Sequence, residues 1–123
     1  MKLRIKGNSL RLRISRSEMA SLLATGVIQD SIHFGIAAEA KLTYSLQHTA
    51  MDEAIRIEYH PQQVTVVIST AAAQRWGGSD EVGIYGTAKV ANGQLELVVE
   101  KDFACLDIAD DDAFPNPNAE AAC

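Results

Sequence analysis

The side chains best suited to chemistry lie near the C-terminal end of the sequence. The candidate metal ligands there are Cys105, Asp107, Asp110 and Asp112. Clustered carboxylates suit a hard cation such as Ca²⁺, and a cysteine thiolate with a histidine suits a transition metal. The spacing does not match a standard calcium loop, because no alternating acids, glycine and final glutamate follow. Two interpretations stay open: a metal- or thiol-dependent activity centred on Cys105 and this tail, or a solvated acidic terminus.

The apolar residues of the same tail offer a structural role instead. Phe103, Leu106, Ile108 and Phe114 would allow the tail to lie across the domain and protect a sheet edge. The acidic residues would then remain in solvent.

The rest of the sequence carries no recognisable catalytic motif. It contains no P-loop, no nucleophile elbow and no Cys-x-x-Cys pair. His33, His48 and His60 are not spaced as two metal ligands on one element. We therefore identify no catalytic residue, predict no cofactor and expect a protein that is not an enzyme.

Basic residues gather at the opposite end of the chain. Six of the eleven lysines and arginines precede the first acidic residue, Glu18. They alternate with aliphatic residues, and we take Arg4, Arg11 and Arg13 as candidate contacts for a partner. A nucleic-acid backbone would reward such clustered charge. However, no aromatic residue lies in or beside this segment and the remaining chain is acidic, so nucleic acid is disfavoured and pairing with acids on neighbouring strands is the plainer interpretation.

Trp76 is the other candidate partner contact. It lies beside Gly77 and Gly78 at the end of a predicted short helix. A tryptophan in this position either exposes an aromatic edge to a ligand or anchors the helix to the core, and the sequence leaves both interpretations open.

Alternating aliphatic residues predict most of the strands that must position these groups. Hairpins are expected over residues 2–15, 55–69 and 82–100, and single strands over 27–34 and 41–48. Helices are expected over 16–25 and 71–76, each followed by glycine. The predicted class is α+β: a mainly antiparallel, curved or barrel-like sheet of about eight strands with two short helices.

The order strand, strand, helix, strand, strand occurs twice in this assignment. Residues 3–15 align with residues 55–69 if the second turn is given two extra residues. This self-similarity suggests a pseudo-twofold duplication, although alternating aliphatic residues also resemble one another by chance. We expect a single domain over residues 1–123, with a possible internal repeat over 2–48 and 54–101 and an acidic tail over 102–123.

Length and composition fit a small globular protein. Of the 123 residues, 47% are hydrophobic and 22% are charged, and no apolar run is long enough to cross a bilayer. The first predicted strand begins at the second residue, which leaves no room for a secretory signal, so we expect a cytoplasmic protein without membrane contact. Cys105 and Cys123 are then expected to be thiols.

Several stretches resemble those of a known family. The opening MKLRIKGNSLRLRISRSE, the central LTYSL and the closing VEKDFACL with DDDAFPNP are similar to a family of short bacterial proteins of about this length without an assigned activity. The resemblance implies a self-contained domain and carries over no functional residue.

These observations favour a small non-catalytic binding or assembly module, which forms a homodimer through a sheet edge or binds an unknown protein partner. The alternatives are the metal- or thiol-dependent activity and nucleic-acid binding through the N-terminal hairpin.

Overall fold

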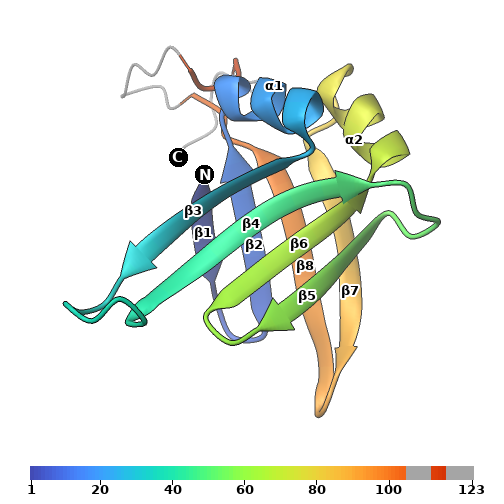
Figure 1. Ribbon diagram of the computed structural model, residues 1–123. Helices are drawn as coiled ribbons and strands as arrows, with labels where there is room; N and C mark the ends of the chain where they lie inside the picture. Colours follow the sequence, from blue (N-terminus) through green and yellow to red (C-terminus); the bar gives the residue numbers. More distant parts are fainter. Residues whose placement is uncertain (105–111, 116–123) are drawn as a thin grey trace.

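The computed structural model describes residues 1–104 and 112–115. Within these residues, eight strands and two helices follow one another (Figure 1). Their order is β1 (Lys2–Ile5), β2 (Ser9–Ile14), α1 (Arg16–Thr25), β3 (Val27–His33), β4 (Lys41–Thr49), β5 (Ile55–His60), β6 (Gln63–Ser69), α2 (Thr70–Gly77), β7 (Gly83–Val90) and β8 (Gly93–Lys101).

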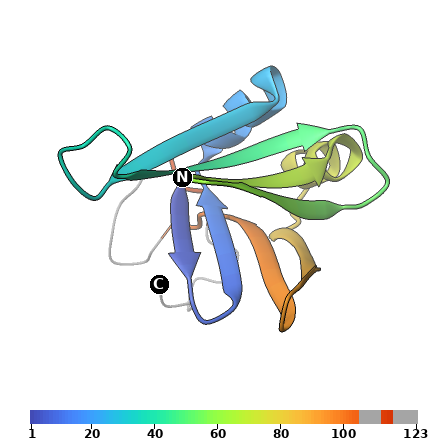
Figure 2. The ribbon, with the colours of Figure 1, turned by 60° about the horizontal axis from the view of Figure 1, so that its bottom comes forward.

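The strands form two four-stranded sheets rather than one sheet. The strand order is β1-β2-β8-β7 in the first sheet and β3-β4-β6-β5 in the second. The central pair of each sheet is parallel and the outer pairs are antiparallel. The predicted α+β class, with eight mainly antiparallel strands and two helices, is confirmed. The sheets do not close into a barrel, and Figure 2 shows them as two separate layers.

The two hairpins of each half of the chain belong to different sheets. Strands β1 and β2 pair with β7 and β8, while β3 and β4 pair with β5 and β6. Helix α1 carries the chain from the first sheet to the second, and α2 carries it back (Figure 1). Both helices lie at the same end of the two sheets, where they contact each other.

The two halves correspond more closely than the sequence alignment suggested. One constant shift in residue number carries Lys6 onto His60, Ser9 onto Gln63 and Ser15 onto Ser69. Lys6 and Ser9 exchange backbone hydrogen bonds around a two-residue turn, and His60 pairs with Gln63 around another. The predicted alignment, which gave the second turn two extra residues, is therefore wrong. It matched apolar residues of the two halves that are two positions out of register.

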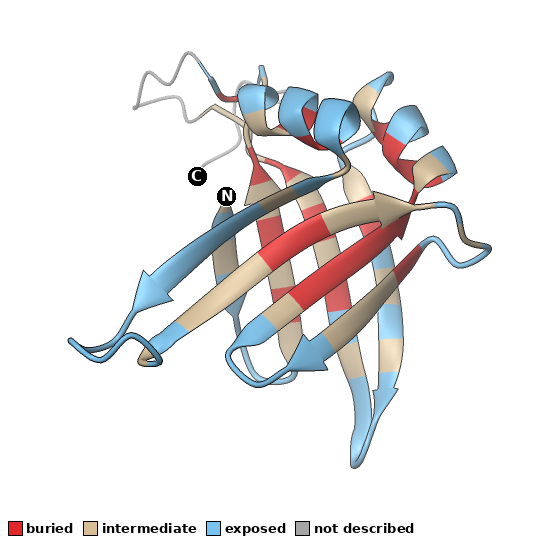
Figure 3. Ribbon diagram, viewed as in Figure 1, coloured by how far each residue is buried: buried red, intermediate tan, exposed pale blue. Residues whose placement is uncertain are grey.

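The core lies between the two sheets and beneath the helices (Figure 3). Its largest fully buried side chains are Trp76, Leu12, Ile14, Leu22, Leu46, Ile68, Leu97, Val66 and Val99. Most come from the central parallel pairs, where every second residue points inward. Burial of each large apolar side chain contributes about 1.5–3 kcal/mol, so the central pairs supply much of the stability.

Equivalent serines begin both helices. The Ser15 hydroxyl accepts a hydrogen bond from the backbone N–H of Glu18, whose carboxylate accepts one from the N–H of Ser15. Ser69 accepts in the same way from Ala72. The predicted capping box is therefore confirmed. Neither helix of the described chain has the length and apolar character needed to span a membrane.

Candidate binding surface

The outer face of the first sheet gathers most of the basic residues of the chain. Along β2, Leu10, Leu12 and Ile14 point into the core, so the residues between them point outward. The strand register places the following residues on this outer face, together with Lys6 in the first turn: Lys2, Arg4, Arg11, Arg13, Tyr85, Thr87, Lys89, Glu96, Val98 and Glu100. We call this set the basic face.

One row of the basic face crosses all four strands. Arg4 pairs with Arg11, Arg11 with Val98, and Val98 with Tyr85. Neighbouring strands lie about 4.8 Å apart, so the row extends over roughly 14 Å. It runs from two guanidinium groups to an aliphatic and an aromatic side chain.

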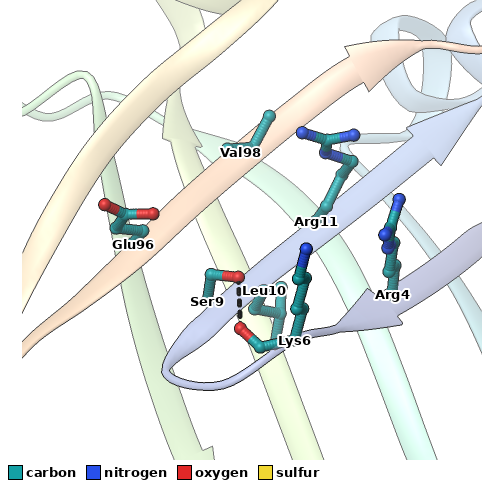
Figure 4. Close-up of a pocket in the computed structure, with 7 residues that line it drawn as sticks. All are labelled: Arg4, Lys6, Ser9, Leu10, Arg11, Glu96 and Val98. Carbon is teal, nitrogen blue, oxygen red and sulfur yellow. Dashed lines mark hydrogen bonds between the residues drawn. The ribbon is translucent and has the colours of Figure 1, made fainter.

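A shallow pocket of about 300 Å³ lies at the basic end of this row. Arg4, Lys6 and Arg11 line one part of it, and Glu96 and Val98 line the β8 side (Figure 4). The Ser9 hydroxyl donates to the carbonyl of Lys6 at 2.7 Å, which fixes the turn beneath the pocket. The three cationic side chains line the same pocket, which suits an anionic group of a partner.

The charge on the basic face is only partly neutralised by the chain itself. Nε of Arg11 lies 3.0 Å from Oε1 of Glu100, and Nζ of Lys2 lies 2.7 Å from Oδ2 of Asp102. Within residues 1–104 and 112–115, no carboxylate forms an ion pair with Arg4, Lys6 or Arg13. The pairing with neighbouring acids that the sequence suggested therefore holds for Arg11 and Lys2.

Tyr85 is the residue on this face that sequence reasoning missed. It is 57% exposed and comes from the second half of the chain, far from the N-terminal hairpin in sequence. Burial and the Glu100 carboxylate raise the pKa of Tyr85, an effect that Arg11 partly offsets, so the phenol remains a hydrogen-bond donor. The antiparallel pairing of β7 with β8 and the parallel pairing of β8 with β2 together place this aromatic ring on the same face as the arginines.

The equivalent face of the second sheet has a different character. Arg56 is paired there with Glu58 at 3.0 Å, and Thr65 and Val67 occupy the positions of Arg11 and Arg13. Both Thr65 and Val67 are buried. The clustered positive charge therefore belongs to the first sheet alone among the described residues.

Comparison with known proteins places the chain in a family. A family model described as a family of unknown function, DUF7009, matches residues 1–118. The chain belongs to this family. No curated protein and no solved structure matches it. The resemblance drawn from the sequence is confirmed, and membership of DUF7009 assigns no activity.

Trp76, the remaining predicted partner contact, is inside the core of this DUF7009 protein. Its side chain is fully buried, and Nε1 donates to the carbonyl of Val82 at 3.1 Å. The hydrogen bond satisfies the polar group of the indole within the core. The structure thus corrects the prediction that Trp76 contacts a partner: the side chain anchors α2 and is not available at the surface.

Asp112, one of the four predicted metal ligands, binds the start of helix α1 instead. Its carboxylate accepts hydrogen bonds from the backbone N–H of Ser17 at 2.9 Å and from its hydroxyl at 2.5 Å. Its carbonyl accepts from the N–H of Arg16 at 2.8 Å. A carboxylate at this helix end satisfies N–H groups that lack an intrahelical partner and complements the helix dipole. The other predicted ligands, Cys105, Asp107 and Asp110, lie outside the described residues.

The two tail phenylalanines of the described chain form a structural contact at the end of β8, which is a central strand, and not along either edge strand of the first sheet. Phe103 and Phe114 form an isolated β-bridge, with their rings in edge-to-face contact at 6.4 Å between centroids. The Lys101 ammonium lies 5.2 Å from the Phe114 ring centroid. Residues 112–115 therefore fold back onto the end of β8; we call them the tail clasp. Leu106 and Ile108 lie outside the described residues.

The three histidines take no part in a metal cluster within residues 1–104 and 112–115. Nδ1 of His48 lies 3.0 Å from the hydroxyl of Thr70 at the start of α2. His33 and His60 are exposed at strand ends.

Two carboxyl groups at the start of helix α1, Asp112 of the tail clasp and Glu18, should make the stability of the protein depend on pH. Hydrogen bonds from Ser17 lower the pKa of Asp112. Burial alone would raise the pKa of Glu18, but hydrogen bonds from the Met1 amino group and Ser15 lower it. A carboxyl group with a lower pKa in the folded state stabilises the fold above its unfolded value, about 4, and loses this contribution as the pH falls through the folded value. We expect the urea midpoint to fall steeply below about pH 4, and to fall less steeply in Asp112→Asn.

The control for this measurement is Asp80→Asn, because Asp80 is an exposed loop residue outside the clasp. Its urea midpoint should follow that of the unmodified protein between pH 7 and pH 3. An Asp112→Asn profile that coincides with both would show that the clasp contributes nothing to acid sensitivity.

Proposed function

We propose that this protein is a non-catalytic binding module that holds a partner protein on its basic face. The observation that supports this is the row from Arg4 through Arg11 and Val98 to Tyr85, which joins cations, an aliphatic residue and an exposed aromatic ring. Arginine and tyrosine are enriched where protein interfaces gain most of their energy. The face bears six of the eleven basic residues of the chain, so the partner is acidic where it docks.

Single-stranded nucleic acid is a second candidate, and Tyr85 is the observation that favours it. A base can stack on an exposed aromatic ring while arginines bind the backbone. Glu96 and Glu100 oppose this, because their carboxylates stand among the arginines on the same face. The net charge of −5 also repels a polyanion from the rest of the molecule. We therefore favour a protein, whose own basic and hydroxyl groups can pair with these carboxylates.

The homodimer through a sheet edge remains a prediction. The hydrogen bonds at the edge strand β3 favour binding through a sheet face over pairing along this edge. The carbonyl of Gly26 accepts from His48 of β4, and the N–H of Phe34 donates to Ala40 just before β4. This pattern leaves the alternate residues of β3, including Val27 and Ser31, facing the free edge. The Val27 carbonyl already accepts from Thr25, and the Ser31 N–H donates to the Asp30 carboxylate. A second chain pairing along β3 would have to break both bonds.

We further propose that the two halves of the chain arose by duplication within one domain. The strand orders of the two sheets become identical when each element is exchanged for its equivalent in the other half. In this account the first copy acquired a binding surface at Arg4, Arg11 and Arg13, whereas the second copy carries Glu58, Thr65 and Val67 at these positions.

The proposed function predicts capture of a partner that depends on the basic face. Purified protein is immobilised and exposed to a lysate of its source, beside the Arg4→Glu/Arg13→Glu variant and the control Lys41→Glu. Lys41 is an exposed strand residue of the second sheet, so the control changes charge without touching the basic face. We expect one protein to be captured by the unmodified chain and by Lys41→Glu, and about tenfold less by the double variant. Equal capture by all three, or by none, would count against the proposal.

A further inference from the structure

We infer that the group docked on the basic face is an amphipathic helix of the partner, lying across the strands, with acidic residues at one end of its contact stripe and apolar residues at the other. This inference rests on the proposed function and names the kind of element that the face accepts. It follows from the spacing and from the order of the side chains in the row Arg4, Arg11, Val98 and Tyr85.

The spacing of the row matches a helix better than a strand. Successive members of the row stand on neighbouring strands, about 4.8 Å apart. A helix places side chains on one face every 5.4 Å, once per turn, whereas a strand places them about 6.7 Å apart on one face. Over three steps, the side chains of a helix end about 2 Å beyond the last member of the row, and those of a strand end about 6 Å beyond it. The error for a strand exceeds the spacing between two neighbouring strands of the sheet. Four successive turns of a helix can therefore each meet one member of the row.

The order of the row fixes the chemistry of those four turns. Arg4 and Arg11 offer guanidinium groups, whose planar forks match the two oxygens of a carboxylate. Arg11 already pairs with Glu100, so Arg4, which has no such partner within residues 1–104 and 112–115, is the stronger anchor. Val98 and the exposed ring of Tyr85 then offer an apolar surface. The matching helix carries acidic residues at positions i and i+4 and apolar residues at i+7 and i+11.

The flanks of the row set a further requirement. Glu96 lines the same pocket as Arg4, Lys6 and Arg11, on the β8 side. Its carboxylate is exposed and would repel an acidic residue placed next to it. A hydroxyl or basic residue on the partner helix, adjacent to the acidic pair, meets this requirement. A uniformly acidic segment does not, and this distinguishes a patterned helix from a polyanion.

The test uses synthetic helical peptides, which need no knowledge of the natural partner. The probe is a fluorescent 18-residue peptide of helix-forming residues with Glu at i and i+4, Leu at i+7 and i+11, and Lys beside the acidic pair. Two controls accompany it: a peptide of the same composition with the stripe dispersed around the helix, and a single-stranded oligonucleotide of similar length. Binding to the full chain is followed by fluorescence anisotropy at physiological salt.

We expect saturable binding of the striped peptide, with affinity about tenfold lower for the dispersed peptide and for the Arg4→Glu variant. Tyr85→Ala should weaken binding about three- to tenfold, and Lys41→Glu should leave it unchanged. Equal binding of both peptides, no effect of Arg4→Glu, or tighter binding of the oligonucleotide would overturn the inference. If the lysate capture still depends on the basic face in that case, the proposed function stands and only the helical partner is wrong.

Discussion

Trp76→Ala is expected to lower the free energy of unfolding by about 3–5 kcal/mol, the largest loss that we expect from a single truncation among the described residues. The indole is the largest fully buried side chain among the described residues, and the change also removes one of the two hydrogen bonds that the Val82 carbonyl accepts, the other coming from the N–H of Lys101. Since domains of this size are stable by about 5–15 kcal/mol, the variant should stand close to unfolding at room temperature. Urea denaturation followed by circular dichroism measures the loss.

A second variant separates the two causes of this loss. Trp76→Phe keeps a large apolar ring but removes the N–H, so it should cost less than half as much as the alanine variant. Trp76 is the counterpart of Leu22, and both side chains are fully buried. If Trp76→Ala changed stability by less than about 1 kcal/mol, the tryptophan could not be the anchor of α2 that the structure indicates.

The local elements of this fold could be predicted from the sequence, because their signals lie within a few residues. Alternating aliphatic residues mark the strands, and Ser15 with Glu18 marks the start of α1. Gly7, in the first turn, has a positive φ of 55°, which glycine adopts at least cost. In each case the interaction that decides the structure joins near neighbours in the chain.

The division into two sheets could not be predicted, because it depends on which hairpins meet. The parallel pairs β2 with β8 and β4 with β6 join residues from opposite halves of the chain. The alternation of apolar and polar residues indicates which residues of a strand face inward, but it does not indicate which strand will pair with it. The same non-local pairing brings Tyr85 to the arginines and so completes the candidate binding surface.

The role of Asp112 was missed for a related reason. An acidic residue in a run of acids looks like a metal ligand or a solvated charge when only its neighbours are considered. Its actual partners, Arg16 and Ser17, lie at the other end of the sequence. Helix N-termini need acceptors, but the sequence does not say which distant carboxylate supplies them.

Gly86→Val is the second change with a large expected effect. The new side chain would clash where β5 contacts β7, the contact that joins the two sheets at one edge. A Cβ atom at Gly86 would lie 2.3 Å from Cγ2 of Ile55. Ile55 is buried, so it has little room to move. Replacing glycine in a strand usually helps strand formation, but here overpacking should cost about 1–3 kcal/mol, and more if the sheets separate.

The equivalent positions in the first half explain why this contact needs glycine. By strand register, Asp30 of β3 is equivalent to Gly86 of β7, and Met1 is equivalent to Ile55. Oδ2 of Asp30 lies 3.9 Å from the amino group of Met1. A polar contact between longer groups replaces direct packing there, so the pseudo-twofold relation is broken at this edge.

A double-mutant cycle tests whether the Gly86 effect acts through Ile55. Ile55→Ala alone should cost about 2–5 kcal/mol, because it leaves a cavity, but it also removes the methyl group that a side chain at position 86 would meet. The combined variant should therefore be more stable than the sum of the single losses predicts, by at least about 1 kcal/mol in urea denaturation. Strictly additive losses would show that valine at position 86 disrupts β7 itself, and that the edge between the two sheets tolerates the extra volume.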